Sequence, residues 1–176
     1  MITLAQDITE SIKKVLNNPQ EFVPLHEPLF SGNESKYVQE CIDSTFVSSV
    51  GKFVDRFEKE LADYTEAKYA VAVVNGTAAL HMSLVALGVG EGDEIIIPAL
   101  SYIATANVVE LVGAKPVFVD IDLKTFNIDV TKIEAAITDK TMAIMPVHEF
   151  GLVADINEII EIASSHNLFV IEDAAC

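Results

Sequence analysis

The stretch EIIIPALSYIATANVVELVGAKPVFVD, residues 94–120, contains two short apolar runs with a helical pattern between them. The runs EIIIP and PVFVD are rich in β-branched residues and nearly continuous in apolar character, which is typical of strands covered on both faces. The intervening residues 104–111 have the length and spacing of a helix. A strand, a helix and a second strand in this order predict two parallel strands joined by a crossover helix.

The same alternation extends in both directions along the chain. Further β-type runs are YAVAVV at 69–74, MAIMPV at 142–147 and LFVIED at 168–173. Additional helical patterns cover 78–87, 130–137 and 156–166. We therefore predict an α/β domain with a mainly parallel sheet and flanking helices over residues 66–176.

Residues 1–65 contain no β-type run and are predicted to form a separate helical segment. Apolar residues recur at helical intervals from Ile8 onward, until an Asn-Asn-Pro breaker ends the pattern. Ser31 and Glu34 have the spacing of a capping box at the start of a second helix. A third amphipathic pattern covers 53–61.

Charge and cysteine content exclude several classes of protein. Eleven Lys and Arg residues against 27 Asp and Glu residues give a formal net charge of -16, which disfavours nucleic acid and anionic membranes as partners. Cys41 and Cys176 are too few for a disulfide framework or a zinc cluster. The first residues lack the pattern of a signal peptide, and charged residues interrupt the most apolar stretch, 99–119. We expect a soluble, cytoplasmic protein without a metal site.

Polar residues follow the predicted strands at the points where ligands bind in open parallel sheets. These groups are Asn75-Gly76-Thr77, Ser101-Tyr102, Asp120 with Asp122, His148-Glu149, and Glu172-Asp173. If the strands are parallel, all five groups lie at one edge of the sheet. Such convergence indicates a ligand site more strongly than any single group does, although turns of any α/β domain are polar.

Gly76 and Thr77 lead from an apolar run into a predicted helix. Unpaired N–H groups and the helix dipole favour an anion such as phosphate at that position. The simpler interpretation is that Thr77 caps the helix, and this is the better one for an isolated Asn-Gly-Thr. The glycine spacing fits neither a dinucleotide loop nor a nucleoside-triphosphate loop.

Three other side chains have a chemical and a structural interpretation. Asp173 follows a buried strand, where a carboxylate needs a cation such as a protonated heterocyclic nitrogen, or else an ordinary cap or ion pair. Tyr102 could stack on an aromatic cofactor or belong to the core. His148 could act as an acid or base, or be a hydrogen-bonded structural residue.

In order and spacing, these pieces resemble the DegT/StrS-type family of pyridoxal-phosphate sugar aminotransferases. The resemblance runs through VVNGTAALHMSLVALGVGEGDEIIIPALSYIATANVVELVGAKPVFVDID, PVHEFGLVADINEI and VIEDAAC. The stretch VPLHEPLFSGNESKYVQECIDSTFVSSVGKFVDRFE looks most like the legionaminic-acid (LegC-like) branch, whose substrate is a nucleotide-linked 4-keto-6-deoxy amino sugar. The resemblance implies the N-terminal part of the large domain of a fold-type-I pyridoxal-phosphate transferase.

The family's roles carry over to the matching positions. The resemblance implies that Gly76 and Thr77 hold the cofactor phosphate, that Tyr102 stacks on the pyridine ring, and that Asp173 binds the pyridinium nitrogen. Cys176 stands where relatives often have a polar residue near the ring oxygen, and a thiol is a weak hydrogen-bonding substitute there. His148 and Glu149 are candidates for the substrate pocket.

The family's Schiff-base lysine and small domain follow this motif, and none of the lysines here has that lysine's context. We therefore expect this chain alone to be inactive, as a truncated gene product or as part of a longer enzyme. The resemblance further implies a nucleotide-sugar substrate, glutamate as amino donor and a homodimer. The alternatives are a non-catalytic binding or regulatory fragment, and a related dehydratase in which histidine replaces the lysine.

Overall fold

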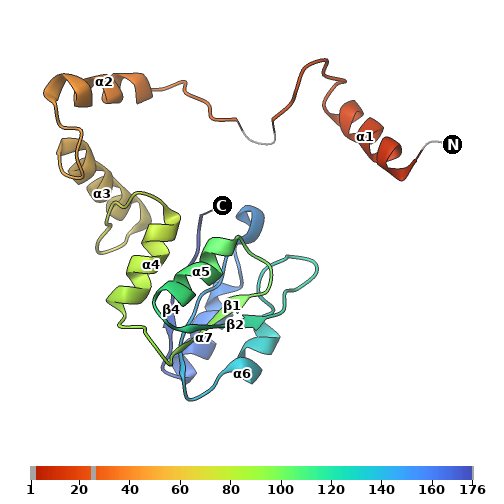
Figure 1. Ribbon diagram of the computed structural model, residues 1–176, viewed down its shortest axis with the longest axis vertical. Helices are drawn as coiled ribbons and strands as arrows, with labels where there is room; N and C mark the ends of the chain where they lie inside the picture. The colour runs from red at the N-terminus through yellow and green to blue at the C-terminus, as the bar shows by residue number, and fades with distance from the viewer. Residues whose placement is uncertain (1–2, 25–26, 176) are drawn as a thin grey trace. The chain divides into compact units, whose positions relative to one another are not determined.

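The computed structural model of the chain describes residues 3–24 and 27–175 (Figure 1). Residues up to Phe57 form one compact unit, and residues from Glu58 onward form a second. The first unit contains α1 (Leu4–Val15), α2 (Glu34–Ser44) and the beginning of α3 (Lys52–Thr65). The remainder of α3 and all of the strands belong to the second unit.

The first helix begins at a side-chain cap. The Thr3 hydroxyl accepts a hydrogen bond from the Gln6 N–H at 3.4 Å, and the Gln6 side chain accepts one from the Thr3 N–H at 2.8 Å. This reciprocal pair satisfies two N–H groups that the helix leaves unpaired. The helix predicted for this segment is confirmed, with its last residue, Val15, just before the Asn-Asn-Pro breaker.

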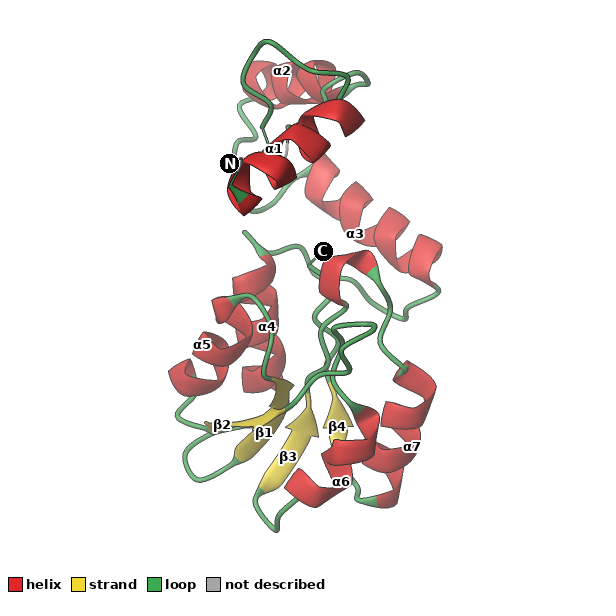
Figure 2. Cartoon of the chain, turned by 90° about the vertical axis from the view of Figure 1, so that its right-hand side faces the viewer, coloured by secondary structure: helices red, strands yellow, loops and turns green. Residues whose placement is uncertain are grey.

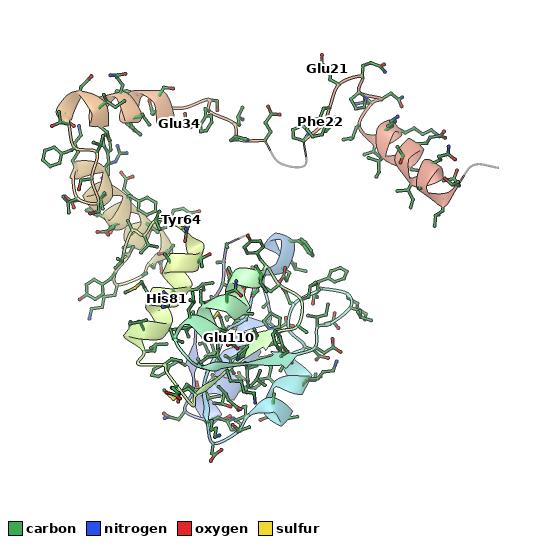
Figure 3. The ribbon with its side chains drawn as sticks, in the orientation of Figure 1. Glu21, Phe22, Glu34, Tyr64, His81 and Glu110 are labelled. Carbon is green, nitrogen blue, oxygen red and sulfur yellow. The ribbon has the colours of Figure 1, made fainter. Side chains whose placement is uncertain are left out.

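The capping box predicted for the second helix is wrong. Asn33 is the N-cap of α2, and its side chain makes no capping hydrogen bond. The Glu34 carboxylate, at the beginning of α2 in Figure 3, instead accepts a hydrogen bond from the Gly32 N–H at 2.9 Å. The helix therefore starts too late for Ser31 to reach its first turn, and the acid binds the preceding loop.

Apolar side chains of the first unit remain largely exposed. None of the side chains in α1, α2 or α3 is buried, and Phe22, in the connector labelled in Figure 3, is 91% exposed. The contacts that join α2 to α3 include an aromatic pair, the rings of Tyr37 and Phe53 at 5.1 Å, and an exposed ion pair between Glu40 and Lys52 at 2.8 Å.

The second unit contains a four-stranded parallel sheet, in which β1 is Glu94–Pro98, β2 is Lys115–Val119, β3 is Thr141–Ile144 and β4 is Phe169–Val170. The strand order is β2-β1-β3-β4, and every neighbouring pair is parallel (Figure 2). The predicted α/β fold with a parallel sheet is therefore confirmed, and the carboxyl ends of its strands lie at one edge.

Helices cover both faces of this sheet, as Figure 2 shows. One face packs against α4 (Gly76–Ala86) and α5 (Ile103–Leu111), and the other against α6 (Ile133–Ala136) and α7 (Ile156–Ser165). Successive residues of β1 alternate between the two cores: Ile95 and Ile97 join the first, whereas Ile96 joins the second. Two 3-10 turns, η1 (Val130–Lys132) and η2 (Glu149–Gly151), complete the unit.

The strand predicted at 69–74 is absent from the described sheet. These residues form neither helix nor strand; Val71 and Val74 are 76% and 88% exposed, and the Ala72 N–H donates to the Glu58 carboxylate at 2.8 Å. An extended segment becomes a strand only when a neighbouring strand pairs with its backbone. Among the described residues no strand pairs with this segment, so the strand predicted from its β-type composition is wrong.

Within the part of the chain that is described, no helix has both the length and the apolar character needed to cross a bilayer.

Candidate functional site

The backbone of Asp173 is fixed by an extension of the β3–β4 pairing beyond the strands. Val147 and Asp173 form a parallel bridge. The Asp173 N–H donates to the Pro146 carbonyl at 2.9 Å, and the His148 N–H donates to the Asp173 carbonyl at 3.1 Å. The sheet therefore places this carboxylate at its carboxyl edge, as the sequence predicts, and leaves the residue only 6% exposed.

The Asp173 carboxylate is bound by neutral donors. Its Oδ2 accepts a hydrogen bond from the Thr105 hydroxyl at 2.8 Å, and its Oδ1 accepts one from the Ala175 N–H at 3.3 Å. Thr105 is fully buried in α5. Within residues 3–24 and 27–175, Asp173 forms no ion pair, so the structural alternative of an internal salt bridge is not realised. A buried carboxylate held in this way is suited to a cationic ligand.

The start of α4 offers free donors for an anion. Asn75 is the N-cap, and its Oδ1 accepts a hydrogen bond from the Ala78 N–H at 2.8 Å. The N–H groups of Gly76 and Thr77 have no acceptor within the helix, because they belong to its first turn. The interpretation of Thr77 as the cap is thus wrong, because Asn75 is the N-cap. Thr77 is exposed and is the second residue of the helix.

The N-terminus of α4 and the segment that follows β4 lie next to each other. A Cβ placed on Gly76 would lie 3.7 Å from the Cβ of Ala175, two residues beyond Asp173. Residues separated by about 100 positions in the sequence therefore form one site, with free N–H groups at one end and a buried carboxylate near the other. This combination of N–H donors and a nearby acid suits a ligand that carries both an anionic group and a cationic group.

Replacing Asn75 tests the cap directly. We expect Asn75→Ala to lower the free energy of unfolding by about 1 kcal/mol, because the Ala78 N–H loses its acceptor. Asn75→Asp retains a side-chain acceptor and is the matched control, expected to stay within about 0.5 kcal/mol of the unmodified chain. Urea unfolding monitored by circular dichroism measures both; equal losses in the two variants would contradict this assignment of the cap.

Tyr102 lies at the same edge, immediately before α5. Its side chain is 78% exposed, so the interpretation of Tyr102 as a core residue is wrong. A cavity of about 120 Å³ borders it and is also lined by Ser101, Thr105 and Phe118. An exposed ring beside a cavity is available for stacking on a planar ligand.

His148 has both ring nitrogens engaged. Its Nδ1 accepts a hydrogen bond from the Ala154 N–H at 3.1 Å, so its Nε2 carries the proton and donates to the Glu172 carboxylate at 3.0 Å. A neutral imidazole satisfies both contacts. The geometry matches the structural alternative, in which His148 fixes the loop that follows β3.

Glu149 is buried and incompletely bonded. Only 5% of the Glu149 surface is exposed, and within the described part of the chain its Oε1 has no hydrogen-bond partner. Burial raises the pKa of this carboxyl above its ordinary value, and the nearby charge of Asp173 raises it further. Its N–H donates to the Asn127 side chain at 3.0 Å, which holds the residue in place.

Asp120 and Asp122 do not join the site. The Asp120 carboxylate accepts from the Ile121 N–H and pairs with Lys132 at 3.2 Å, and these two contacts lower its pKa in that order. Asp122 accepts from the N–H groups of Lys124 and Thr125 and therefore shapes a turn. Cys176, predicted near the ring oxygen, lies outside the described residues.

Metal chemistry has no ligand set in the described parts of the chain, where no group of three or more His, Cys, Asp or Glu side chains is arranged to hold an ion. Two residues that complete the site are not identified from the sequence. Thr105 lies in an apolar helix, and its one signal is its position four residues after Ser101, whose hydroxyl lies 2.8 Å from the Thr105 hydroxyl. Asn127 has no comparable pattern.

A family model and several known proteins match most of the chain. The model of the DegT/DnrJ/EryC1/StrS aminotransferase family matches residues 29–176. GDP-perosamine synthase of Caulobacter vibrioides is 57% identical over 148 residues, which cover 84% of this chain and 40% of that protein. The chain therefore spans about two fifths of the length of the curated relatives it matches.

Two solved structures extend the comparison. An aminotransferase from Psychrobacter cryohalolentis is 40% identical, with a TM-score of 0.81 over 86% of this chain and 38% of that one. The GDP-4-keto-6-deoxy-D-mannose-3-dehydratase of E. coli, with bound hydrated pyridoxal phosphate, is 33% identical, with a TM-score of 0.79 over 86% of this chain and 40% of that one.

Proposed function

The chain belongs to the DegT/DnrJ/EryC1/StrS aminotransferase family, and on this basis we propose that it forms the cofactor-binding part of a nucleotide-sugar aminotransferase. The observation that carries the proposal is the juxtaposition of the α4 N-terminus with the buried, unpaired Asp173. The described residues fit pyridoxal 5'-phosphate, because this cofactor has a phosphate at one end and a basic ring nitrogen at the other.

Each end of the cofactor has its own partners in the proposed site. The N–H groups of Gly76 and Thr77, with the Thr77 hydroxyl, bind the phosphate. Asp173 holds a proton on the ring nitrogen by supplying the negative charge beside it. The exposed ring of Tyr102 covers one face of the pyridine. When bound, the cofactor supplies an electron sink for the carbon that exchanges its amino group.

The proposed substrate is a nucleotide-linked 4-keto-6-deoxy sugar that receives an amino group at C4, with glutamate as amino donor. The names of two relatives support the nucleotide: one is a GDP-perosamine synthase, and the other acts on GDP-4-keto-6-deoxy-D-mannose. The proposal places the lysine that binds the cofactor covalently in a polypeptide longer than these 176 residues, and a second copy of the chain across the site.

The dehydratase is the second candidate, because the E. coli enzyme shares this fold and binds the same cofactor. Expression of the complete gene, followed by incubation with pyridoxal phosphate, glutamate and the GDP-linked 4-keto-6-deoxy sugar, separates the two. Mass spectrometry of the sugar nucleotide detects either replacement of the keto oxygen by an amino group or loss of a hydroxyl oxygen. An unchanged sugar with every nucleotide tested would refute both functions.

Phosphate binding by Thr77 is tested with pyridoxamine 5'-phosphate, which needs no lysine to bind. We expect Thr77→Ala to weaken its binding by about 3-fold to 10-fold, since a hydrogen bond to a charged group contributes roughly 1 kcal/mol or more. Thr77→Ser keeps the hydroxyl and is expected to retain the affinity. Fluorescence titration measures both; a comparable loss with pyridoxamine, which lacks the phosphate, would contradict the role.

A further inference from the structure

The residues at the end of β4 point alternately to the two faces of the sheet. Val170 packs against the second core, on the side of α6 and α7, and Ile171 belongs to the first core, on the side of α4 and α5. The alternation continues beyond the strand, because the Asp173 carboxylate accepts from Thr105 in α5, on the side of the first core. Glu172 therefore belongs to the opposite face from Asp173.

His148 binds Glu172 on that opposite face. Its Nε2 donates to the Glu172 carboxylate at 3.0 Å, and its Nδ1 accepts from the N–H of Ala154, a residue of the second core, at 3.1 Å. The His148 N–H also donates to the Asp173 carbonyl at 3.1 Å. A single residue thus holds Glu172 by its side chain and Asp173 by its backbone.

The regular pairing that leads to Asp173 is short. Among the residues that the structure describes, β4 pairs with β3 through Phe169 and Val170, and one further bridge joins Val147 to Asp173. A shift of one residue in this pairing would turn Asp173 toward the second core and away from Thr105. The orientation of the carboxylate therefore depends on the register beyond the strand.

The contact between His148 and Glu172 is specific for the observed register. In this register both side chains lie on one face of the sheet, close enough for a hydrogen bond. After a shift of one residue they would lie on opposite faces, and the bond from the imidazole to the carboxylate would be lost. Hydrogen bonds to charged groups are the stronger ones, so this loss opposes the shift.

We propose that His148, through its hydrogen bond to Glu172, is a positioning residue that fixes the register after β4 and so keeps the Asp173 carboxylate on the face covered by α4 and α5. His148 acts from the opposite face of the sheet and does not contact the ligand. The value of this position for a ring nitrogen rests on the proposed function, whereas the register itself does not.

Amide side chains separate the two contacts of the His148 ring. Glutamine can place its amide nitrogen where Nε2 lies and still donate to Glu172, whereas the shorter asparagine can accept from the Ala154 N–H but does not reach Glu172. We expect His148→Asn to weaken binding of pyridoxamine 5'-phosphate by about 3-fold to 10-fold, and His148→Gln to stay within about 2-fold of the unmodified chain. Titration by the fluorescence of the ligand measures both variants.

Glu172 gives a matched test from the other side of the bond. Its side chain is 51% exposed, so its replacement is expected to leave the fold intact. Glu172→Ala should weaken binding by about 3-fold to 10-fold, whereas Glu172→Gln, which still accepts from Nε2, should stay within about 2-fold. Full affinity of Glu172→Ala would overturn the role of His148. Equal losses in the two variants would also overturn it, because they would show an effect of charge alone.

A double-mutant cycle distinguishes positioning from a general loss of structure. Because His148 acts through Asp173, adding His148→Asn to Asp173→Asn should weaken binding by less than about 2-fold further. Losses that add in full would contradict a role through Asp173.

Hydrogen exchange at the Asp173 N–H, which donates to the Pro146 carbonyl at 2.9 Å, reports the register without any ligand. We expect His148→Asn and Glu172→Ala to speed this exchange, measured by NMR, by about 3-fold to 10-fold, and the two glutamine variants to leave it within about 2-fold. Unchanged exchange in Glu172→Ala would refute the register role. If exchange responds as expected but no form of the chain binds the ligand, the proposed function fails, while the role of His148 in the register stands.

Discussion

Asp173→Asn is expected to lower the affinity of the chain for pyridoxamine 5'-phosphate by about 30-fold to 5,000-fold. The reason is that truncating one partner of a buried, hydrogen-bonded charge pair costs roughly 2–5 kcal/mol. Asparagine has nearly the same shape and can still accept from Thr105, but its amide has no negative charge to pair with the protonated ring nitrogen. The measurement is equilibrium titration by the fluorescence of the bound ligand.

The matched control for this variant is Asp120→Asn. Asp120 also follows a strand, but its side chain is 70% exposed and pairs with Lys132. Exposed ion pairs contribute little, so this variant should bind the ligand as the unmodified chain does. Equal affinities in all three proteins would show that Asp173 does not bind the ring nitrogen. A loss in both variants would indicate a general effect of net charge.

Leu84→Ala should lower the free energy of unfolding of the second unit by about 2–5 kcal/mol. Leu84 lies on the inner face of α4, is fully buried, and packs in the core that also contains Ile95 and Val108. Truncation removes its buried methyl groups and leaves a cavity that the surrounding strand and helix can fill only partly. Urea unfolding at a fixed pH measures the change.

Val85→Ala is the control on the same helix, because Val85 is 48% exposed. Its expected loss is within about 0.5 kcal/mol, the usual range for surface substitutions. Similar losses for Leu84→Ala and Val85→Ala would mean that α4 does not cover the sheet as described. Since α4 also presents Gly76 and Thr77, the same result would remove the structural basis for the phosphate site.

The strands from residue 94 onward are predictable because local composition and burial agree in them. EIIIP forms β1, which is buried on both faces, and the helical pattern after it forms α5. The run at 69–74 has equally favourable composition, but a strand also needs a pairing neighbour, and composition does not report one. The cap of α2 fails for a related reason, because Glu34 binds Gly32 rather than the helix.

The position of Asp173 follows from sheet topology and is predictable, whereas its surroundings are not. The strand preceding it places the carboxylate at the carboxyl edge of the sheet, but Thr105, its hydrogen-bond donor, lies 68 residues earlier in the chain. Likewise, the sequence singles out Glu149 without showing that its carboxyl is buried near Asp173. Contacts between distant segments depend on packing, which single-sequence patterns do not encode.

The most direct measurement of the central claim is isothermal titration of the 176-residue chain with pyridoxamine 5'-phosphate, compared with pyridoxamine and with inorganic phosphate. The account predicts one bound pyridoxamine 5'-phosphate per chain, weaker binding of either fragment, and loss of the ring contribution in Asp173→Asn. If a folded chain binds none of the three, or binds pyridoxamine 5'-phosphate no more tightly than inorganic phosphate, then the α4 N-terminus and Asp173 do not form a cofactor site.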